Sequence, residues 1–323
     1  MLEGETGNAH AYTVAVGVVV VALLASLAGG PVHAPFEPCS VYAAAAPAVP
    51  RNIPQHITTL VTSYIALENA KHSIEEYREW METMVCIASP LVVFADAASA
   101  EVIRGIREDC LDGADIVVNV VDGFADLYTA QWQEQLHAQA HEDPEAKIGH
   151  SAELYMIWNE KTAWLDEVAR KNPFGTQYFA WIDIGYFRGP EYHTERAAFY
   201  KVAWPAASRT QVFDAGRVLV LGVAPVVPGS AECADADAVY GSFSKRGVGG
   251  GFIGGTAAAI ARWRKAYYEL MGRFLGEGRF VGKDQVTMAA VACWQPDVVE
   301  VVPACGGDWF YMASYLRELR LQG

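Results

Sequence analysis

The stretch LVVFADAASAEVIRGIREDCLDGADIVVNVV, residues 91–121, decides the fold class of this chain. Apolar and β-branched residues at Leu91–Phe94 predict a short buried strand, and the pattern over Ala98–Cys110 predicts a helix. A second β-branched run, Ile116–Val121, predicts another strand. Strands that alternate with helices of about ten or more residues are typical of a mostly parallel sheet, so we predict an α/β fold.

The same alternation extends along the chain on both sides of this stretch. Further strands are expected at 57–64, 178–183, 217–221 and 298–302. Further helices are expected at 72–87, 124–140, 151–171, 257–274, 284–294 and 309–319. No repeat and no linker interrupts the pattern, so we predict one domain over residues 55–323, with helices on both faces of its sheet.

The composition excludes some classes of protein. The chain has 323 residues, of which 52% are hydrophobic, and it can bury a core without metals or disulfides. Its formal net charge is −14, whereas a sequence-independent grip on nucleic acid needs an excess of Lys and Arg. We therefore expect no nucleic-acid partner, although a few local groups would be enough to hold a small anion.

The N-terminal segment has a composition of its own. Residues 1–50 contain no Lys or Arg, and the uncharged run Ala11–Ala28 would span about 27 Å as a helix, close to the thickness of a bilayer. We predict a short tail over 1–10, a single transmembrane signal-anchor over 11–28 and an Ala- and Pro-rich stem over 29–54. A cleaved signal peptide and a buried core helix are the alternatives.

The six cysteines lie at positions 39, 86, 110, 233, 293 and 305, without a C-x-x-C pair. This spacing excludes the common zinc modules and thioredoxin-like motifs. Buried free thiols are one interpretation. One or two disulfides are the other, if the domain lies in an oxidising lumen.

Asp183 ends the apolar strand expected at 178–183. Open α/β sheets bind ligands beyond the carboxyl ends of their strands. A carboxylate in that position needs a cation, a metal or hydrogen-bond donors, and Arg188 is near enough in sequence to be its partner. Asp183 is therefore a candidate ligand-binding or metal-binding residue. A turn cap, or a simple ion pair with Arg188, is the alternative.

Six glycines cluster in residues 247–255 and include a formal G-x-G-x-x-G. The residues before it, 240–246, are polar, whereas a dinucleotide-binding fingerprint follows a strand. We therefore expect a loop whose backbone can approach a ligand closely, followed by a helix that begins at Thr256 and could meet an anion. A plain surface loop is the alternative.

Lys161, Asp284 and Gln285 are further candidates. Lys161 lies among aromatic residues of an expected helix, where a solvated helix face is the alternative interpretation. Asp284 and Gln285 follow Lys283 at the start of another helix, where an acid is favourable as a cap alone.

The sequence argues against two other kinds of site. The literal D-x-D at Asp235 and Asp237 lies in a Pro- and Gly-containing loop, whereas metal ligands need a rigid support. A nucleophile–histidine system is not indicated, because the chain has no G-x-S-x-G elbow and all eight His residues lie at or before His193.

Several of these segments together resemble the HtrL/YibB family. They are Thr58–Tyr64, Tyr77–Trp80, Leu91–Phe94, Tyr155–Lys161, Asn172–Phe174, Tyr178–Arg188, Gly251–Gly255 and Lys283–Gln285. The resemblance runs from about Ile57 to the C-terminus, and Trp181–Gly185 and Gly251–Gly255 are its most specific pieces. The family is associated with bacterial lipopolysaccharide loci and is similar in pattern to glycosyltransferases of the GT-A fold.

The resemblance implies a membrane-anchored GT-A-like glycosyltransferase. Such an enzyme moves a sugar from a nucleotide-sugar donor to a glycan or lipid-linked acceptor. It would be a single-pass membrane protein, in the Golgi or endomembrane lumen of a eukaryote and otherwise membrane-associated or secretory. A non-catalytic glycan-binding or scaffold protein with a degenerate glycosyltransferase fold is the alternative.

The resemblance also implies roles for individual residues. Asp183 matches the first acid of the D-x-D motif, which holds a divalent cation (Mn²⁺ or Mg²⁺), and Asp183 and Asp284 are the expected catalytic carboxylates. The expected substrate-binding residues are Lys161, Arg188, Gly251, Gly254, Gly255, Lys283 and Gln285. The second acid of the motif is Gly185 here, which argues against a complete metal site, although Asp297 or Asp308 could supply a ligand.

Overall fold

The computed structural model describes residues 57–68, 70, 72–112, 115–188, 199–224, 233 and 247–317. All of them lie in one unit of the chain, residues 42–323. The predicted tail, signal-anchor and stem (1–54) and the D-x-D of residues 235–237 lie outside the described residues. Within the described part, no helix has both the length and the apolar character needed to span a membrane.

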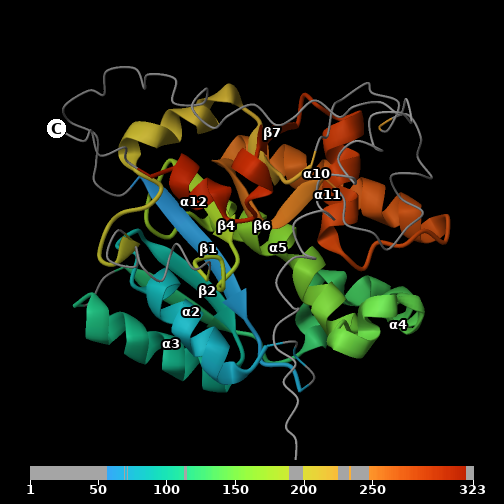
Figure 1. The fold of residues 1–323 in the computed structure, drawn as a ribbon, viewed down its shortest axis with the longest axis horizontal. Coiled ribbons are helices and arrows are strands. Elements are labelled where there is room, and N and C mark those ends of the chain that lie inside the picture. The colour runs from blue at the N-terminus through green and yellow to red at the C-terminus, as the bar shows by residue number, and fades with distance from the viewer. Residues whose placement is uncertain are drawn as a thin grey trace, which may run out of the picture. The chain divides into compact units, whose positions relative to one another are not determined.

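Seven strands form one sheet in the order β3-β2-β1-β4-β6-β5-β7 (Figure 1). The strands are β1 (Thr58–Tyr64), β2 (Leu91–Ala95), β3 (Ile116–Val120), β4 (Tyr178–Ile182), β5 (Val218–Gly222), β6 (Val248–Thr256) and β7 (Val299–Pro303). Neighbouring strands are parallel except at β6, which is antiparallel to both β4 and β5. The predicted α/β fold with a mostly parallel sheet is confirmed.

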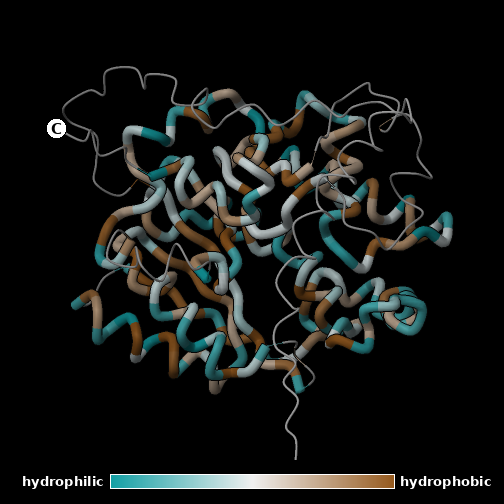
Figure 2. Tube along the Cα trace, viewed as in Figure 1, coloured by the Kyte–Doolittle hydropathy of each residue, from teal (hydrophilic) through white to brown (hydrophobic). Residues whose placement is uncertain are grey.

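Helices cover both faces of this sheet (Figure 1). The α-helices are α2 (Ile74–Val85), α3 (Ala97–Cys110), α4 (Gln133–Glu142), α5 (Ala152–Lys171), α10 (Ala257–Gly276), α11 (Asp284–Trp294) and α12 (Tyr311–Tyr315). Short 3-10 helices span Phe124–Asp126, Tyr128–Trp132, Pro144–Ile148, Ala207–Ala215 and Cys305–Gly307. Teal and brown alternate along α2 and α3 in Figure 2, as expected of helices with one apolar face.

The side chains of β4 show how the two layers are divided. Phe179 and Trp181 point into a core shared with α5, α10 and α11. Tyr178, Ala180 and Ile182 point into the opposite core, shared with α2, α3 and α12. Because both faces are buried, the strand reads as a continuous apolar run instead of an alternating one.

The glycine-rich segment 247–255 forms strand β6 instead of the predicted loop. Ile253 pairs with Trp181 and Phe252 with Ile182 in the centre of the sheet. The glycines are needed because neighbours come close: a Cβ on Gly251 would lie 2.8 Å from the Tyr186 ring. Close packing and flexible loops both favour glycine, so the pattern alone did not distinguish the two.

Two disulfides are present among the described residues. Cys86 is bonded to Cys110, with Cα atoms 5.8 Å apart, and Cys233 to Cys293, with Cα atoms 5.2 Å apart. The first joins the end of α2 to the end of α3. The interpretation as free thiols is therefore wrong for these four cysteines.

The strand order brings several strand ends to one edge of the sheet. Strands β1 to β4 are parallel, so their carboxyl ends meet there, and the antiparallel β6 brings its amino end to the same edge. From β1 the chain adds β2 and then β3 on one side of β1, and it then places β4 on the other side of β1. The direction of strand addition therefore switches between β1 and β4. A crevice outside such a switch point is the usual ligand site of an open α/β sheet.

Candidate active site

A buried lysine joins two carboxylates at this edge of the sheet. The Nζ atom of Lys161 lies 3.0 Å from Oδ1 of Asp183 and 2.9 Å from Oδ2 of Asp284, and it donates to the Gly250 carbonyl at 3.0 Å. An ammonium group has three N–H donors, and each has an acceptor here. Lys161, with a side chain only 5% exposed, therefore has no donor left for a ligand, and the alternative interpretation as a solvated helix face is wrong.

Helix α5 positions Lys161 through its contact with β4. Trp164, one turn further along α5, stacks on Trp181 with ring centroids 6.0 Å apart. The Lys161 Nζ atom also lies 6.0 Å from the centroid of the Trp181 ring. The helix is capped by the Ser151 hydroxyl at its start and ends at Asn172 in the left-handed region. Aromatic packing between α5 and the sheet thus fixes where the ammonium group lies.

Asp183 is the carboxylate of the cluster that reaches solvent, with a side chain 40% exposed. Its Oδ1 atom accepts from the Trp181 indole N–H at 2.9 Å as well as from Lys161, and its backbone N–H donates to the Gly251 carbonyl. Within the described part of the chain, no donor is bonded to its Oδ2 atom. This oxygen is available to a ligand.

Asp284 is buried under the same cluster, with a side chain 7% exposed. Its Oδ1 atom accepts from the backbone N–H of Gln285 at 2.8 Å, and its Oδ2 atom from Lys161. Burial raises the pKa of Asp284 above its ordinary value, although the charge of Lys161 opposes this. Burial lowers the pKa of Lys161, but the carboxylates of Asp183 and Asp284 outweigh it and hold the ammonium form.

The other predicted site residues divide into two groups. Gly251 and Gln285 lie beside the cluster: Gly251 leaves room for the Tyr186 ring near Asp183, and the Gln285 side chain donates to the Val248 carbonyl at 3.1 Å. Gly254 and Gly255 pair with Ala180 and Phe179 on the first half of β4, away from Asp183. The antiparallel direction of β6 carries these two glycines toward the opposite edge.

Arg188 and Lys283 do not contact the two carboxylates. The Arg188 guanidinium lies over the rings of Trp80 and Phe310, 5.0 and 5.7 Å from their centroids, and Lys161 takes the place by Asp183 that Arg188 was expected to fill. The Lys283 ammonium pairs with Glu145 and is buried.

Sequence reasoning missed a cavity of about 250 Å³ at the ends of β1, β2 and β3. Its lining is apolar and acidic and consists of Ile65, Asp96, Val121, Asp122, Gly123 and Phe124. Ile65, Asp96 and Val121 each follow directly on a strand. Their position at the ends of predicted strands was the only sequence signal for this cavity, because these residues belong to no motif.

Two tyrosines interact electrostatically with residues of the cavity wall and of the charged cluster. The rings of Tyr64 and Tyr77 are 5.0 Å apart. Burial raises the pKa of Tyr64 to about 12, and the charge of Asp96, in the cavity wall, adds to the effect. Burial also raises the pKa of Tyr77, which interacts with the charges of Arg188 and Asp183. The paired tyrosine rings thus interact electrostatically with Asp96 in the cavity wall and with Asp183 in the charged cluster.

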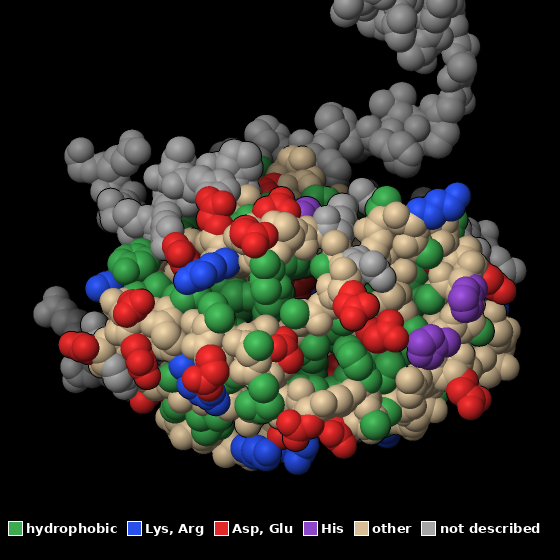
Figure 3. All heavy atoms as spheres, turned by 90° about the horizontal axis from the view of Figure 1, so that it is seen from below, with side chains coloured by type: hydrophobic (Ala, Val, Ile, Leu, Met, Phe, Trp, Pro, Cys, Tyr) green, Lys and Arg blue, Asp and Glu red, His purple; other side chains and the backbone are tan. Residues whose placement is uncertain are grey.

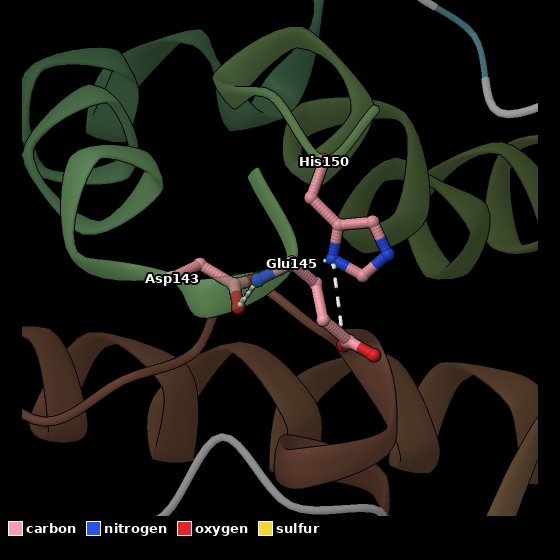
Figure 4. Close-up of side chains that lie close together, drawn as sticks. All are labelled: Asp143, Glu145 and His150. Atoms are coloured by element: carbon pink, nitrogen blue, oxygen red, sulfur yellow. Dashed lines mark hydrogen bonds and ion pairs between the residues drawn. The ribbon is translucent and has the colours of Figure 1, made fainter. Parts of the chain in front are cut away.

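A separate group that could hold a metal ion consists of Asp143, Glu145 and His150 (Figure 4). Asp143 accepts from the Tyr155 hydroxyl and from the Glu145 N–H, and it lies 3.0 Å from Nδ1 of His150. Glu145 already pairs with the Lys283 ammonium. The Lys283 ammonium therefore already provides the positive charge for these carboxylates. Its ion pair connects the loop of residues 143–150 to the start of α11, which begins at Asp284.

The face shown in Figure 3 agrees with the acidic composition. Asp and Glu side chains are more frequent there than Lys and Arg, and they surround hydrophobic side chains in a hollow. A track for a polyanion would show the opposite balance.

The family model described as "Bacterial protein of unknown function (HtrL_YibB)" matches residues 56–317, which confirms the resemblance read from the sequence. A search of curated protein sequences gave no match. Among solved structures, the chain is similar to mouse Xyloside xylosyltransferase 1 in its apo form, with a TM-score of 0.40 and 12% identity. That similarity covers 76% of this chain and 84% of the other.

Proposed function

We propose a transferase function for this chain, which belongs to the HtrL/YibB family. In this proposal it moves a sugar from a nucleotide-sugar donor to a glycan or lipid-linked acceptor. The observation that carries the proposal is the joint placement of a cavity and a solvent-facing carboxylate, that of Asp183, at the switch point of the sheet. Nucleotide ligands of open α/β sheets bind in such crevices.

The cavity suits the nucleoside part of the donor. Ile65 and Phe124 offer apolar surface for a base, and Asp122 is an exposed carboxylate that can accept hydrogen bonds from ribose hydroxyls. At about 250 Å³ it falls below the roughly 300–1,000 Å³ of pockets that enclose a drug-sized ligand, so the rest of the donor would extend outside it. Its lining contains no Lys or Arg, which places the phosphates outside the cavity as well.

The charged cluster suits the transfer step. The reaction breaks the bond between the anomeric carbon and the diphosphate oxygen and forms one to an acceptor oxygen, whose proton must pass to a base. The free Oδ2 atom of Asp183 can take this proton or orient a sugar hydroxyl. Asp284 does not reach solvent, so we assign it a positioning role through Lys161.

The residues present fit a divalent cation poorly. Three of the four carboxylate oxygens of Asp183 and Asp284 already accept hydrogen bonds from described groups, and Gly185 offers none. Mg²⁺ needs near-octahedral oxygen coordination. The Lys161 ammonium, whose positive charge would repel a cation, already lies 3.0 Å from Asp183. The proposed transfer is therefore assigned to the side chains of this chain alone.

We further propose that residues 11–28 anchor the protein in a membrane and that the domain lies in an oxidising compartment. The two disulfides among the described residues support the oxidising compartment, because such bonds persist mainly outside the cytosol. Alkaline carbonate extraction of membranes tests the anchor. Full-length protein should stay in the pellet, whereas release into the supernatant would contradict the anchor.

A second candidate, a non-catalytic glycan-binding protein, is favoured by one observation. Gly185 supplies no acid, and Lys161 neutralises one charge of the remaining pair. Such a protein would bind glycans without releasing a nucleoside diphosphate.

The test uses the full chain in detergent. Calorimetric titration with the diphosphates of uridine, guanosine, adenosine, cytidine and thymidine and with their sugar conjugates should identify at least one ligand. The Asp183→Asn variant should bind it but release nucleoside diphosphate about 100-fold more slowly or worse. The control Glu269→Gln, at a side chain 64% exposed on α10, should match wild type. If none of these compounds binds, the proposal fails; binding without turnover would favour the second candidate.

A further inference from the structure

Gly185, two residues after Asp183, packs against an aromatic ring. A Cβ on Gly185 would lie 3.1 Å from Cε3 of Trp80, closer than most real side-chain contacts. Trp80 is buried on the inner side of α2 and also contacts the rings of Tyr77 and His72. A carboxylate at position 185 would therefore require the packed Trp80 indole to shift by a few tenths of an ångström. The absence of the acid is thus part of the packing at this turn.

The same indole supports a cation. The Arg188 guanidinium lies 5.0 Å from the Trp80 ring centroid and 5.7 Å from that of Phe310, and Arg188 is exposed. Stacking on aromatic rings engages the faces of a guanidinium and leaves its N–H edge available. Within the described ranges, no carboxylate forms an ion pair with Arg188. Gly185 is therefore next to a ring that carries a positive charge.

The neighbouring lysines differ from Arg188 in this respect. All three donors of Lys161 are used within the cluster. Lys283 is paired with Glu145 and buried. Arg188 lies over the Trp80 ring, and the same ring packs against Gly185, two residues after Asp183, so Arg188 lies on the Asp183 side of the site. Arg188 is therefore well placed to meet an anion that enters beside Asp183.

We infer that Arg188 binds the diphosphate group of the donor, without a divalent cation at Asp183. This inference rests on the proposed function for the identity of the donor. A guanidinium matches phosphate oxygens with two parallel N–H bonds, which a lysine ammonium does not reproduce. Arg188 would also offset the negative charge that develops on the leaving diphosphate.

The first experiment measures binding of inorganic pyrophosphate to the full chain by calorimetry in the presence of EDTA. Wild type should bind it, and Arg188→Gln should bind about 10- to 100-fold more weakly, as expected for a lost charge-assisted hydrogen-bond pair. Arg188→Lys should fall between the two. The matched control is Lys265→Gln, which removes a charge from a side chain 75% exposed on α10 and should leave the affinity unchanged.

The second experiment repeats the titration with the nucleoside diphosphate that wild type binds best and with the corresponding nucleoside. Arg188→Gln should weaken the diphosphate and leave the nucleoside unchanged. Addition of Mn²⁺ in place of EDTA should change the wild-type affinity less than twofold.

Unchanged pyrophosphate binding by Arg188→Gln, or binding only with Mn²⁺, would overturn the inference. Nucleotide binding that is independent of Arg188 would also overturn the inference, but it would leave the proposed function intact. Pyrophosphate binding through Arg188 without binding of any nucleotide would contradict the proposed function instead.

Melting temperatures check that each variant folds. If Arg188→Gln does not fold, Arg188→Lys decides the question, because a bidentate contact predicts at least a severalfold loss there.

Discussion

The Nζ atom of Lys161 lies 2.9 Å from Oδ2 of Asp284, and both side chains are buried. The two residues are on different helices, α5 and α11, whose packing against the sheet brings the charges together. A buried ion pair is held in place by its geometry, and removal of one partner leaves the other charge without compensation. The pair therefore links the stability of the fold to the arrangement of the site.

Lys161→Met should lower the free energy of unfolding by about 3–5 kcal/mol, because Asp284 is left buried without its cation. Urea denaturation measures the change. In the Lys161→Met, Asp284→Asn double variant, part of the loss should be regained. Lys265→Met, at an exposed position of α10, should differ from wild type by less than about 0.5 kcal/mol. Equal stability of Lys161→Met and wild type would contradict a buried ion pair between Lys161 and Asp284.

Gly250→Ala should destabilise the protein by about 1–3 kcal/mol and reduce transfer activity. Its Cβ would lie 2.7 Å from both carboxylate oxygens of Asp284, which would have to leave Lys161. Gly105→Ala is the matched control, because it lies in α3 with no atom within 4 Å of the new methyl group. There alanine should stabilise the helix by up to about 1 kcal/mol. A neutral effect at position 250 would argue against the tight approach of β6 to α11.

Asp143 should contribute stability at neutral pH that is lost in acid. Burial raises the pKa of its carboxyl group, but hydrogen bonds from the Tyr155 hydroxyl and the Glu145 N–H, and from His150, lower it more, so that it lies below its ordinary value. Below about pH 3.9 the unfolded chain takes up a proton that the folded state binds less readily. The stability present above this pH is thus lost as the pH falls through the folded-state pKa.

Urea denaturation between about pH 6 and 3 tests this sign. Asp143→Asn should be less stable than wild type at pH 6, and the difference should shrink as the pH falls. Asp109→Asn, at an exposed position of α3, should follow the wild-type curve. A difference between Asp143→Asn and wild type that stays constant with pH would contradict the assignment.

Much of the architecture was predictable from local pattern. The β-branched or apolar runs at β1, β2, β3, β4, β5 and β7 lie within one or two residues of the expected strands. Strands β2, β4 and β5 are buried along their whole length, which is why they are almost entirely apolar. Strand β6 was not predicted. Its glycines are required by Tyr186, Phe213 and Asp284, which are distant in sequence and invisible to a local pattern.

The candidate site was predictable in part. The carboxyl end of β4 singled out Asp183, and the start of α11 singled out Asp284. Their connection through Lys161 was not predictable, because a lysine on a helix is usually solvated and its burial depends on what the helix packs against. The same holds for Arg188, whose partners Trp80 and Phe310 come from α2 and the segment before α12.

The sequence by itself determined the α/β class, most strand and helix positions and the family, because these depend on periodicity and on short motifs within a segment. Only the tertiary structure decided the direction of β6, the burial of Lys161 between two acids and the cavity at the ends of β1, β2 and β3. Each of these depends on contacts between segments far apart in the chain. Whether a side chain is buried and which charge it pairs with depend on these tertiary contacts, whereas secondary structure depends largely on the local sequence.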